Sequence, residues 1–577
     1  MNQSQIPFLG DDGFYHPTSE NDIIALVQKA GAENLQIRCR GAAHSLSWAI
    51  YTDPLPGGPE LPDEVSCEQA PAGPNLNLMF DKYYGLEWSK TADDEIEVEA
   101  GIHLGIDPND PTHTSTLQNS LLWQILQKGY TLSDLGGISH QTISGFLMTG
   151  SSGGSLWYSI EENIIGISMI DGNGAVEWFT KDDENFGAMA PSLGLLGIVS
   201  KVRLKLTPNF NIYGQQITYP TDAMLCPIDL FGEGLPGKPS LEIFLKQTPY
   251  SRLLWWPQDG MERLVIWEAA RGAAMPVFDP QPYLEFEDNS FMTNVEQMAA
   301  AILFTMLGNT KFGAVWQKLK PSFDDFNTVI TQGWGNGFFA WLFAGIITFI
   351  LKVVGFVLAF VLMLFPKFME NTLYPFILDK LQPLTKKGKG QLFMDYTYNS
   401  LPMDNNASDI MMDTEFTEIW IPLEYTARAM NLVNNIFNEG KTNATGYYST
   451  EIYAGKKNSN WLSPAYMRDV IRIDFFWFRN NEGNPGNEGG FFSQYWDALE
   501  KEKIPFRLHW AKFLPEYDYA KWAAYFKSQY PRWDDFMALR EKRDPKNIFL
   551  TDYWSRHLFG DNKAAMNKST GANGKDR

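Results

Sequence analysis

The residues of this sequence best suited to chemistry lie in two short stretches of its first third. The first runs from Ile37 to Asp53 and places His44 directly after the small-residue turn Gly41-Ala-Ala. Small residues let a ligand approach the backbone, and the imidazole that follows could be a ligand, a base or a point of covalent attachment. A lone histidine in such a place is more often a structural residue held by hydrogen bonds.

The second stretch, Tyr130 to Gly154, concentrates glycines and hydroxyl side chains. Backbone N–H groups and short hydroxyls are the donors that bind a diphosphate where no basic side chain surrounds it. The stretch contains neither a Walker sequence nor GxGxxG. Taken alone, it permits a phosphate site without requiring one.

The composition of the chain limits the classes of function to which these residues could belong. The 577 residues carry 47 Lys and Arg against 68 Asp and Glu, and the net charge of −21 opposes binding to nucleic acid. A hydrophobic fraction of 44% predicts a globular chain, and its length predicts more than one domain. The three cysteines are widely spaced, so we expect no disulfide framework and no metal site. The first residues lack the features of a secretory signal peptide.

The elements that must position these residues change in character along the chain. From about residue 18 to 202, apolar runs alternate with helical stretches, which indicates an α/β arrangement. From about residue 208 to 506, scattered aromatic-rich strands with helical segments indicate a second, mixed domain. Residues 561–577 are polar and are expected to form a disordered tail.

One segment departs from the globular pattern. Residues 337–365 are almost wholly apolar, and Lys352 is their only charge. At about 1.5 Å per residue a helix of this length would exceed the roughly 30 Å of a bilayer core, which favours membrane contact over a helix buried in a domain. Lys352 and Gly355 in its middle predict two short helices meeting there rather than one. The lysines that follow could face anionic lipid or form an ordinary solvated surface; they are Lys367, Lys380, Lys386, Lys387 and Lys389.

Four strings in order along the chain resemble the FAD flavoproteins of the vanillyl-alcohol oxidase family, in particular their aldonolactone and alditol oxidase branch. The segment from about Trp255 to Asp325 is also similar, more distantly, to the cap of covalent-flavin cholesterol oxidases. The four strings are Gly41-Ala-Ala-His44-Ser, Gly136 to Gly145, Ser192 to Leu204, and His509-Trp-Ala-Lys512 with the segment Tyr530 to Phe549 that follows it.

This resemblance implies an α+β, two-domain protein. Residues 1–207 would form a PCMH-type FAD-binding domain, and residues 208–530 an antiparallel-sheet cap. Within the cap, about residues 334–390 would be a hydrophobic, membrane-contacting helical insertion. Residues 531–560 would return to the FAD domain.

The resemblance also implies FAD as the cofactor, bonded covalently through His44. Gly136 matches a position beside the flavin where a small residue leaves room for dioxygen, which favours an oxidase over a dehydrogenase. The implied cofactor-binding residues are Gly41, His44, Ser45, Gly136, Gly137, Ser139, Thr142, Gly145, Thr149, Ser151, Gly153, Gly197, Ile198 and Lys512.

Glu451, Tyr453 and Lys512 are the catalytic candidates that the resemblance implies. Alternate residues of a strand share a face, so Glu451 and Tyr453 would both face the flavin and could take or orient a hydroxyl proton. Lys512 could stabilise charge on the reduced ring. Alternatively, Glu451 and Lys512 form a structural ion pair and Tyr453 is a core aromatic. Tyr453 stands where relatives carry Arg, and Ser152 where they carry His, which argues against a sugar or lactone substrate.

We therefore expect an FAD-dependent oxidase that acts on the CH–OH group of a lipophilic alcohol and releases hydrogen peroxide. The alternatives are an alditol or aldono-1,4-lactone oxidase, and a catalytically silent flavin- or lipid-binding protein. A single membrane crossing within 337–365 would separate His44 from Lys512, so we expect monotopic attachment to membrane lipid from the cytoplasmic side.

Overall fold

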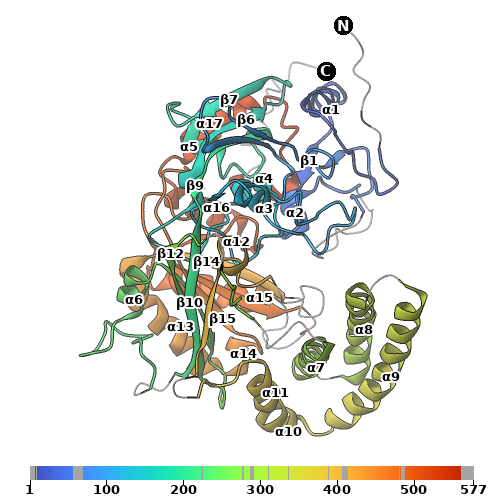
Figure 1. Cartoon of the computed structure of the whole chain (residues 1–577), viewed down its shortest axis with the longest axis vertical. Coiled ribbons are helices and arrows are strands. Elements are labelled where there is room, and N and C mark those ends of the chain that lie inside the picture. Colours follow the sequence, from blue (N-terminus) through green and yellow to red (C-terminus); the bar gives the residue numbers. More distant parts are fainter. Residues whose placement is uncertain are drawn as a thin grey trace.

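The computed structural model describes residues 7, 9–55, 69–221, 225–275, 278–285, 291–309, 311–334, 337–386, 389–405, 414–479, 481 and 488–560. The expected tail, 561–577, and Lys387 of the lysine cluster lie outside the described residues. In Figure 1 the amino-terminal part lies above a large sheet, and the helices of the hydrophobic insertion project at the lower right.

The amino-terminal part combines small sheets with short helices. Its first helix begins after Ser19, whose side chain accepts a hydrogen bond from the Asp22 N–H and so satisfies one free donor of the first turn. A parallel pair, β1 and β2, and a five-stranded antiparallel sheet in the order β3-β4-β8-β6-β7 form its core. The strands are β1 (Ile37–Arg40), β2 (Leu76–Met79), β3 (Leu86–Trp88), β4 (Glu95–Glu99), β5 (Tyr130–Thr131), β6 (Ile164–Ile170), β7 (Val176–Thr180), β8 (Ile198–Lys205) and β9 (Thr207–Pro208). The helices are α1 (Glu20–Glu33), α2 (Ser47–Ile50), α3 (Leu121–Leu126), α4 (Ile143–Thr149), η1 (Ile160–Asn163) and α5 (Phe186–Met189).

The lower part is built on one antiparallel sheet in the order β13-β10-β12-β11-β15-β16-β14-β17. Its strands are β10 (Phe210–Pro220), β11 (Tyr250–Trp256), β12 (Arg263–Ala273), β13 (Gln391–Tyr396), β14 (Thr414–Pro422), β15 (Thr450–Gly455), β16 (Val470–Phe478) and β17 (Arg507–Leu508). Its helices are α6 (Leu241–Gln247), α12 (Thr397–Ser400), η3 (Leu423–Tyr425), α13 (Thr426–Gly440), α14 (Thr442–Thr445) and α15 (Glu488–Lys501). The next helix, α16 (Tyr519–Gln529), packs against the last helix of the chain.

The last two helices, α17 (Trp533–Arg543) and α18 (Asp552–Phe559), lie against the amino-terminal part. The Ile37 N–H donates to the Ile548 carbonyl at 2.8 Å, and the Trp554 indole N–H donates to the Ala49 carbonyl at 3.0 Å. These bonds tie the end of the chain to the β1 region, which carries His44.

The insertion between β12 and β13 consists of helices that form a hydrophobic core of their own. Phe304 packs edge-to-face on Phe478 at 5.7 Å between ring centroids and so attaches the insertion to the large sheet. The helices are α7 (Phe291–Leu307), α8 (Phe312–Trp334), α9 (Phe338–Leu362), α10 (Pro366–Phe368), η2 (Met369–Leu373) and α11 (Tyr374–Leu381).

The prediction of two short helices meeting near Lys352 is wrong, because α9 is one continuous helix of 25 residues. The Lys352 ammonium lies 2.6 Å from a carboxylate oxygen of Asp324 on α8, so its charge is paired without a break in α9. Gly355 lies against Phe323, and a Cβ at this position would be 2.7 Å from its ring. The glycine therefore serves close packing of the two helices rather than interruption of one.

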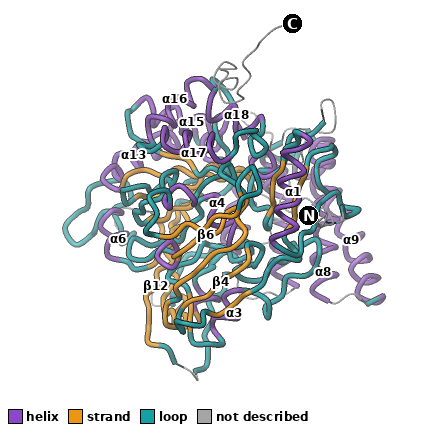
Figure 2. The backbone as a smooth tube through the Cα atoms, turned by 90° about the horizontal axis from the view of Figure 1, so that it is seen from above, coloured by secondary structure: helices purple, strands orange, loops and turns teal. Residues whose placement is uncertain are grey.

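Most of α9 faces away from the rest of the chain. Its buried residues, Ala344, Thr348, Gly355 and Ala359, follow one stripe. On the other faces large apolar side chains are exposed, Phe339 by 71% and Phe349 by 67%. It is long and apolar enough to cross a membrane, although α8 packs along it, and Figure 2 shows both helices at the edge of the molecule.

Candidate active site

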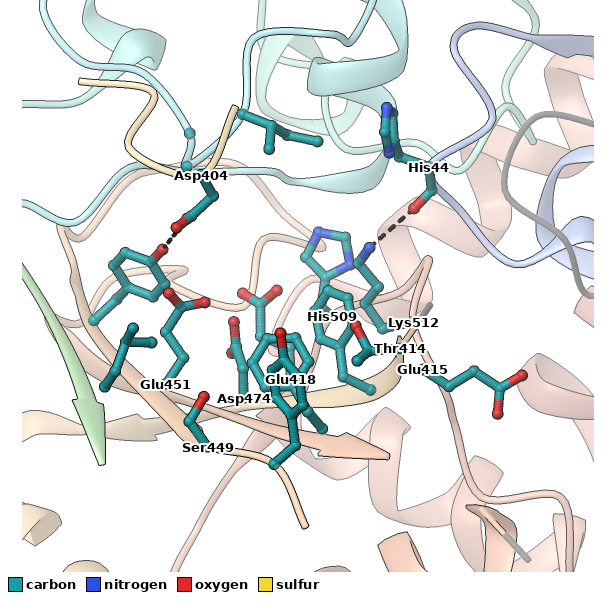
Figure 3. Close-up of a pocket in the computed structure, with 18 of the residues that line it drawn as sticks. His44, Asp404, Thr414, Glu415, Glu418, Ser449, Glu451, Asp474, His509 and Lys512 are labelled. Carbon is teal, nitrogen blue, oxygen red and sulfur yellow. Dashed lines mark hydrogen bonds between the residues drawn. The ribbon is translucent and has the colours of Figure 1, made fainter. Parts of the chain in front are cut away.

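Two connected cavities lie between the amino-terminal part and the large sheet. The larger has a volume of about 300 Å³ and the smaller about 120 Å³. His44, Ser45, Ser151 and Lys512 line both, so the two cavities meet at the turn that follows β1. Figure 3 shows the larger one, with His44 and Lys512 on one side and acidic side chains along the sheet.

The smaller cavity is lined by the turn after β1, by α4 and by the glycine-containing turn before β8. These segments approach one another closely, since a Cβ at Gly41 would collide with the Thr142 hydroxyl, and Gly197 has a φ of 140°. The predicted cofactor residues that line it are Gly41, His44, Ser45, Thr142, Gly145, Thr149, Ser151, Gly197, Ile198 and Lys512.

The other predicted cofactor residues lie elsewhere. Gly136 and Gly137 line the larger cavity. Ser139 and Gly153 line neither cavity: the Ser139 N–H donates to the Asn405 side chain at 2.9 Å, and the Gly153 carbonyl accepts from Arg472 at 3.0 Å.

His44 has the properties that a covalent attachment point needs. Its Nε2 is buried and has no hydrogen-bond partner among the described residues. Burial, with smaller effects of His140 and Lys512, lowers the pKa of the imidazole well below its usual value, so the ring is neutral. A neutral imidazole with a free nitrogen between two cavities fits a flavin bonded at this point.

Lys512 is held on the backbone of the same turn. Its ammonium donates to the His44 carbonyl at 2.9 Å and lies 4.1 Å from the centre of the Phe416 ring. His509, three residues earlier, lines the same cavity, and burial lowers its pKa to about 4. The positive charge at this end of the larger cavity is therefore that of Lys512, because His509 is neutral at physiological pH.

Glu451 and Tyr453 both line the larger cavity, as the alternation of residues along a strand predicts. The Tyr453 hydroxyl donates to Asp404 at 3.0 Å. Burial, followed by repulsion from Glu451, raises the pKa of Tyr453 well above its usual value, so it stays a neutral phenol. Glu451 lies 3.8 Å from the Arg252 guanidinium, which makes Arg252 its ionic partner here rather than the Lys512 of the predicted alternative.

Sequence reasoning missed many of the charged or titratable residues of this cavity, and the five that matter most to the chemistry proposed below come from strands β11, β14 and β16 or the segment after β17. Arg472 lies directly opposite Tyr453 on β16. It donates to Glu418 at 2.8 Å and to the carbonyls of Ser152 and Gly153 at 2.8 and 3.0 Å. A neighbouring strand thus supplies the cation that Tyr453 does not. These five are Arg252, Glu418, Arg472, Asp474 and His509, and the cavity is also lined by Glu285, Asp404, Glu415, Tyr448 and Arg479.

The carboxyl groups of this cavity differ in protonation. Burial raises the pKa of Glu451, and the attraction of Arg252 offsets part of the rise. Burial, followed by repulsion from Glu418, raises the pKa of Asp474 well above its usual value. For Glu418, burial is outweighed by the attraction of Arg472 and other cations, so its pKa is lowered. The carboxyls of the site therefore lose their protons at different pH values, a combination suited to proton transfer.

The helical insertion supplies both apolar and amide side chains to the lining of the larger cavity. Phe304 and Gln297 of α7, Leu381 of α11 and the following Gln382 line it together with Trp256 of β11. The helical insertion thus contributes directly to the cavity.

The comparisons with known proteins agree in the type of enzyme. A family model described as D-arabinono-1,4-lactone oxidase matches residues 367–557. L-gulonolactone oxidase from Bos taurus is 21% identical over 554 residues, which cover 95% of each chain. D-arabinono-1,4-lactone oxidase from Eremothecium gossypii is 23% identical over 268 residues, which cover 45% of this chain and 40% of that protein. This second similarity therefore spans only about two fifths of the relative's length.

The fold is similar to that of cholesterol oxidase from Brevibacterium sterolicum, with a TM-score of 0.59, 14% identity and 94% of each chain covered. The predicted resemblance to PCMH-type FAD flavoenzymes and to their aldonolactone oxidase branch is confirmed, as is the α+β fold with an antiparallel-sheet cap. The predicted cofactor, FAD, and the predicted oxidoreductase class that uses oxygen agree with these similarities.

Proposed function

We propose that this chain is an FAD-dependent oxidase that acts on a CH–OH group of a small, hydroxyl-rich substrate of the aldono-1,4-lactone or alditol class. The observation that carries the proposal is the wall of the larger cavity, where Glu451, Asp474 and Arg472 are buried together. Charged and hydrogen-bonding groups in a cavity favour substrates with hydroxyls, because an apolar ligand would leave those groups unpaired.

The residues of the smaller cavity would hold FAD, with the flavin bonded to His44 where the two cavities meet. When bound, FAD accepts a hydride from the substrate carbon, and dioxygen takes the two electrons to give hydrogen peroxide. The protein's own groups would do the remaining work. Arg252 and Arg472 orient carboxylates, the carboxylates accept the hydroxyl proton, and the Lys512 ammonium stabilises negative charge beside His44.

The sequence alone favoured a lipophilic alcohol as substrate. The similarity to D-arabinono-1,4-lactone oxidase and L-gulonolactone oxidase and the charged lining of the cavity support the alternative substrate, an aldonolactone or alditol. A lipophilic alcohol is the second candidate, because the apolar side chains of Phe304, Leu381 and Trp256 also line the cavity.

A substrate screen tests the proposal. Hydrogen peroxide release is measured with purified, flavin-loaded protein and aldono-1,4-lactones, alditols, a sterol and a long-chain alcohol, each with and without detergent. We expect release with a lactone or an alditol, and bleaching of the flavin absorbance by the same compound without oxygen. Release with the sterol or long-chain alcohol alone would replace the first candidate by the second. Flavin that no compound bleaches would indicate a catalytically silent protein.

We also propose that α9 attaches the protein to one leaflet of a membrane. Large exposed apolar side chains along a helix of 25 residues support this, as does the pairing of Lys352 with Asp324, which compensates the one charge of the run. α8, which packs along α9, carries the charged residues Lys318, Lys320 and Asp324. The pair suits a position at the membrane surface with α8 toward water.

Flotation with phosphatidylcholine vesicles tests this attachment. The wild type is expected to float with the vesicles, and the double variant Phe339→Asp/Phe349→Asp is expected to stay in solution. Leu392→Asp is a matched control, because Leu392 is 68% exposed on β13, outside the insertion. Equal flotation of the double variant and the wild type would contradict the proposal.

A further inference from the structure

Three carboxylates lie side by side across the centre of the large sheet. Glu451 of β15 is directly opposite Asp474 of β16, and Asp474 is directly opposite Glu418 of β14. Cross-strand neighbours of this kind have Cβ atoms about 4.5–5.5 Å apart and share one face of the sheet. All three side chains are buried and line the larger cavity, as Figure 3 shows. We refer to Glu451, Asp474 and Glu418 as the carboxylate row.

The two outer members of the carboxylate row have cationic partners. Glu418 accepts a hydrogen bond from Arg472 at 2.8 Å, and Glu451 lies 3.8 Å from Arg252. The central member differs, since Oδ1 of Asp474 is buried and has no hydrogen-bond partner among the described residues. A buried carboxyl oxygen without a partner costs free energy unless a ligand supplies one.

The groups that face Asp474 explain its state. Glu418 and Glu451 flank it on the adjacent strands, and Arg472 precedes it by two residues on its own strand. Lys512 and the neutral His509 approach from the segment after β17, and Lys512 attracts the Asp474 carboxylate. Because three adjacent buried carboxyls cannot all be ionised, the row retains a proton at pH values where a solvated aspartate has lost it.

We propose that Asp474 is the residue that accepts the hydroxyl proton of the substrate. This role rests on the proposed oxidase function and names its proton acceptor. The substrate O–H bond breaks, and the proton forms an O–H bond with Asp474. The carbon is oxidised to a carbonyl as its C–H bond breaks, and the two electrons leave as hydride to the flavin of the proposed oxidase. Glu418 and Glu451 act as positioning residues that keep Asp474 basic.

Substitution of Asp474 tests this role through the reductive reaction. In Asp474→Asn the side chain keeps its shape but cannot take a proton, so we expect the rate constant of anaerobic flavin reduction to fall about 100-fold or more. Flavin content and the dissociation constant of the substrate should change little. Asp474→Glu should restore part of the rate, and the loss of rate at low pH should shift downward or disappear in Asp474→Asn.

Asp395→Asn is the matched control, because Asp395 is a buried aspartate of the same sheet that lies on β13 and lines neither cavity. It should reduce its flavin at the wild-type rate. Wild-type rate and pH profile in Asp474→Asn would overturn the role of Asp474, and so would an equal loss of rate in Asp395→Asn.

Infrared spectroscopy provides a readout without substrate. In the flavin-loaded wild type, a carboxyl C=O stretch should appear as the pH is lowered over the range in which the rate of flavin reduction falls, and this band should be absent in Asp474→Asn but present in Asp395→Asn. An Asp474 that is still protonated at the pH of fastest reduction would overturn the proposal, because a protonated carboxyl cannot accept the substrate proton. Failure of every lactone and alditol to reduce the wild-type flavin would instead overturn the proposed function, so the two failures are distinguishable.

Discussion

At the scale of single residues, His44 connects the sequence pattern with the proposed chemistry. It follows a turn of small residues, its neutral ring lies where the two cavities meet, and its Nε2 has no partner among the described residues. Its carbonyl also anchors Lys512. One residue would thus carry the proposed covalent bond to the flavin, and its carbonyl positions the cation beside it.

We expect His44→Ala to abolish covalent attachment of the flavin, because no imidazole nitrogen is left to form the bond. Acid-precipitated wild type should give a yellow pellet, and precipitated His44→Ala a colourless pellet with any flavin in the supernatant. His113→Asn, an exposed histidine of the amino-terminal part, is the control and should behave as the wild type. A yellow His44→Ala pellet would contradict the assignment.

The family resemblance singled out Glu451 and Tyr453, and the alternation of residues along one strand, a local property, predicted that they share a face. Arg252, Arg472 and Asp474 could not be found in this way. Arg472 and Asp474 meet β15 only through the pairing of β15 with β16, and the pairing of β11 with β15 brings Arg252 to the same site. Strand order and register depend on the folding of the whole sheet, so they cannot be predicted from the spacing of residues in the sequence.

At the scale of elements, the pairing of α8 with α9 decides the form of the hydrophobic run. A charge and a glycine in an apolar stretch predicted a break, but their partners, Asp324 and Phe323, lie in another helix. Such partners cannot be read from the run itself. The apolar character of residues 337–365 can be read from the sequence of this segment alone. That the segment forms one unbroken helix depends on its contacts with α8.

We expect Gly355→Ala to loosen the α8–α9 pair, since the added Cβ would lie 2.7 Å from the Phe323 ring. Overpacking of this kind costs about 1–3 kcal/mol. Gly345→Ala on the same helix is the matched control: its Cβ meets nothing within 4 Å, and alanine should favour the helix by up to about 1 kcal/mol. Amide hydrogen exchange of α8 and α9 should be faster than wild type in the first variant and no faster in the second.

Helix α18 carries a titratable group whose effect on stability has a definite sign. His557 is buried, its Nδ1 lies 2.9 Å from the Tyr553 carbonyl, and burial lowers its pKa from 6.5 to about 4. A histidine whose folded pKa is lowered stabilises the protein fully above the unfolded pKa. This stabilisation is lost as pH falls from about 6.5 through about 4.

Replacement of His557 by a side chain that does not titrate should reveal this loss. Relative to His557→Gln, the wild type should lose about 2–3 kcal/mol between about pH 7 and about pH 4. Thermal unfolding midpoints of the two proteins over this range measure the difference. Parallel profiles would show that His557 does not titrate in this way.

At the scale of the whole molecule, the insertion fixes which side of the protein would face a membrane. The net charge of −21 repels anionic lipid over most of the surface, so attachment must come from apolar contact at one place. Trp341 on α9 is 59% exposed, and Trp157 in the amino-terminal part is 46% exposed. The Trp157 indole N–H donates to the Lys246 carbonyl of α6, which lies on the opposite side of the large sheet from α9 in Figure 1, so the two indoles report on different sides of the molecule.

With vesicles of brominated lipid, we expect part of the tryptophan fluorescence of the wild type to be quenched. Trp341→Phe should remove most of that quenched part, because bromine atoms in the acyl chains reach only residues at the lipid surface. Trp157→Phe should leave it unchanged. Quenching that depends on Trp157 instead would place the opposite side of the protein on the membrane.

The insertion that carries α9 also supplies Phe304 and Leu381 to the wall of the larger cavity. A shift of α9 would therefore reach the wall of the larger cavity through the shared core of the insertion. An enzyme constructed in this manner would change its turnover on adsorption to a lipid surface even when the dissolved substrate is unchanged. Its rate would then depend on the amount of lipid surface as well as on the concentration of substrate.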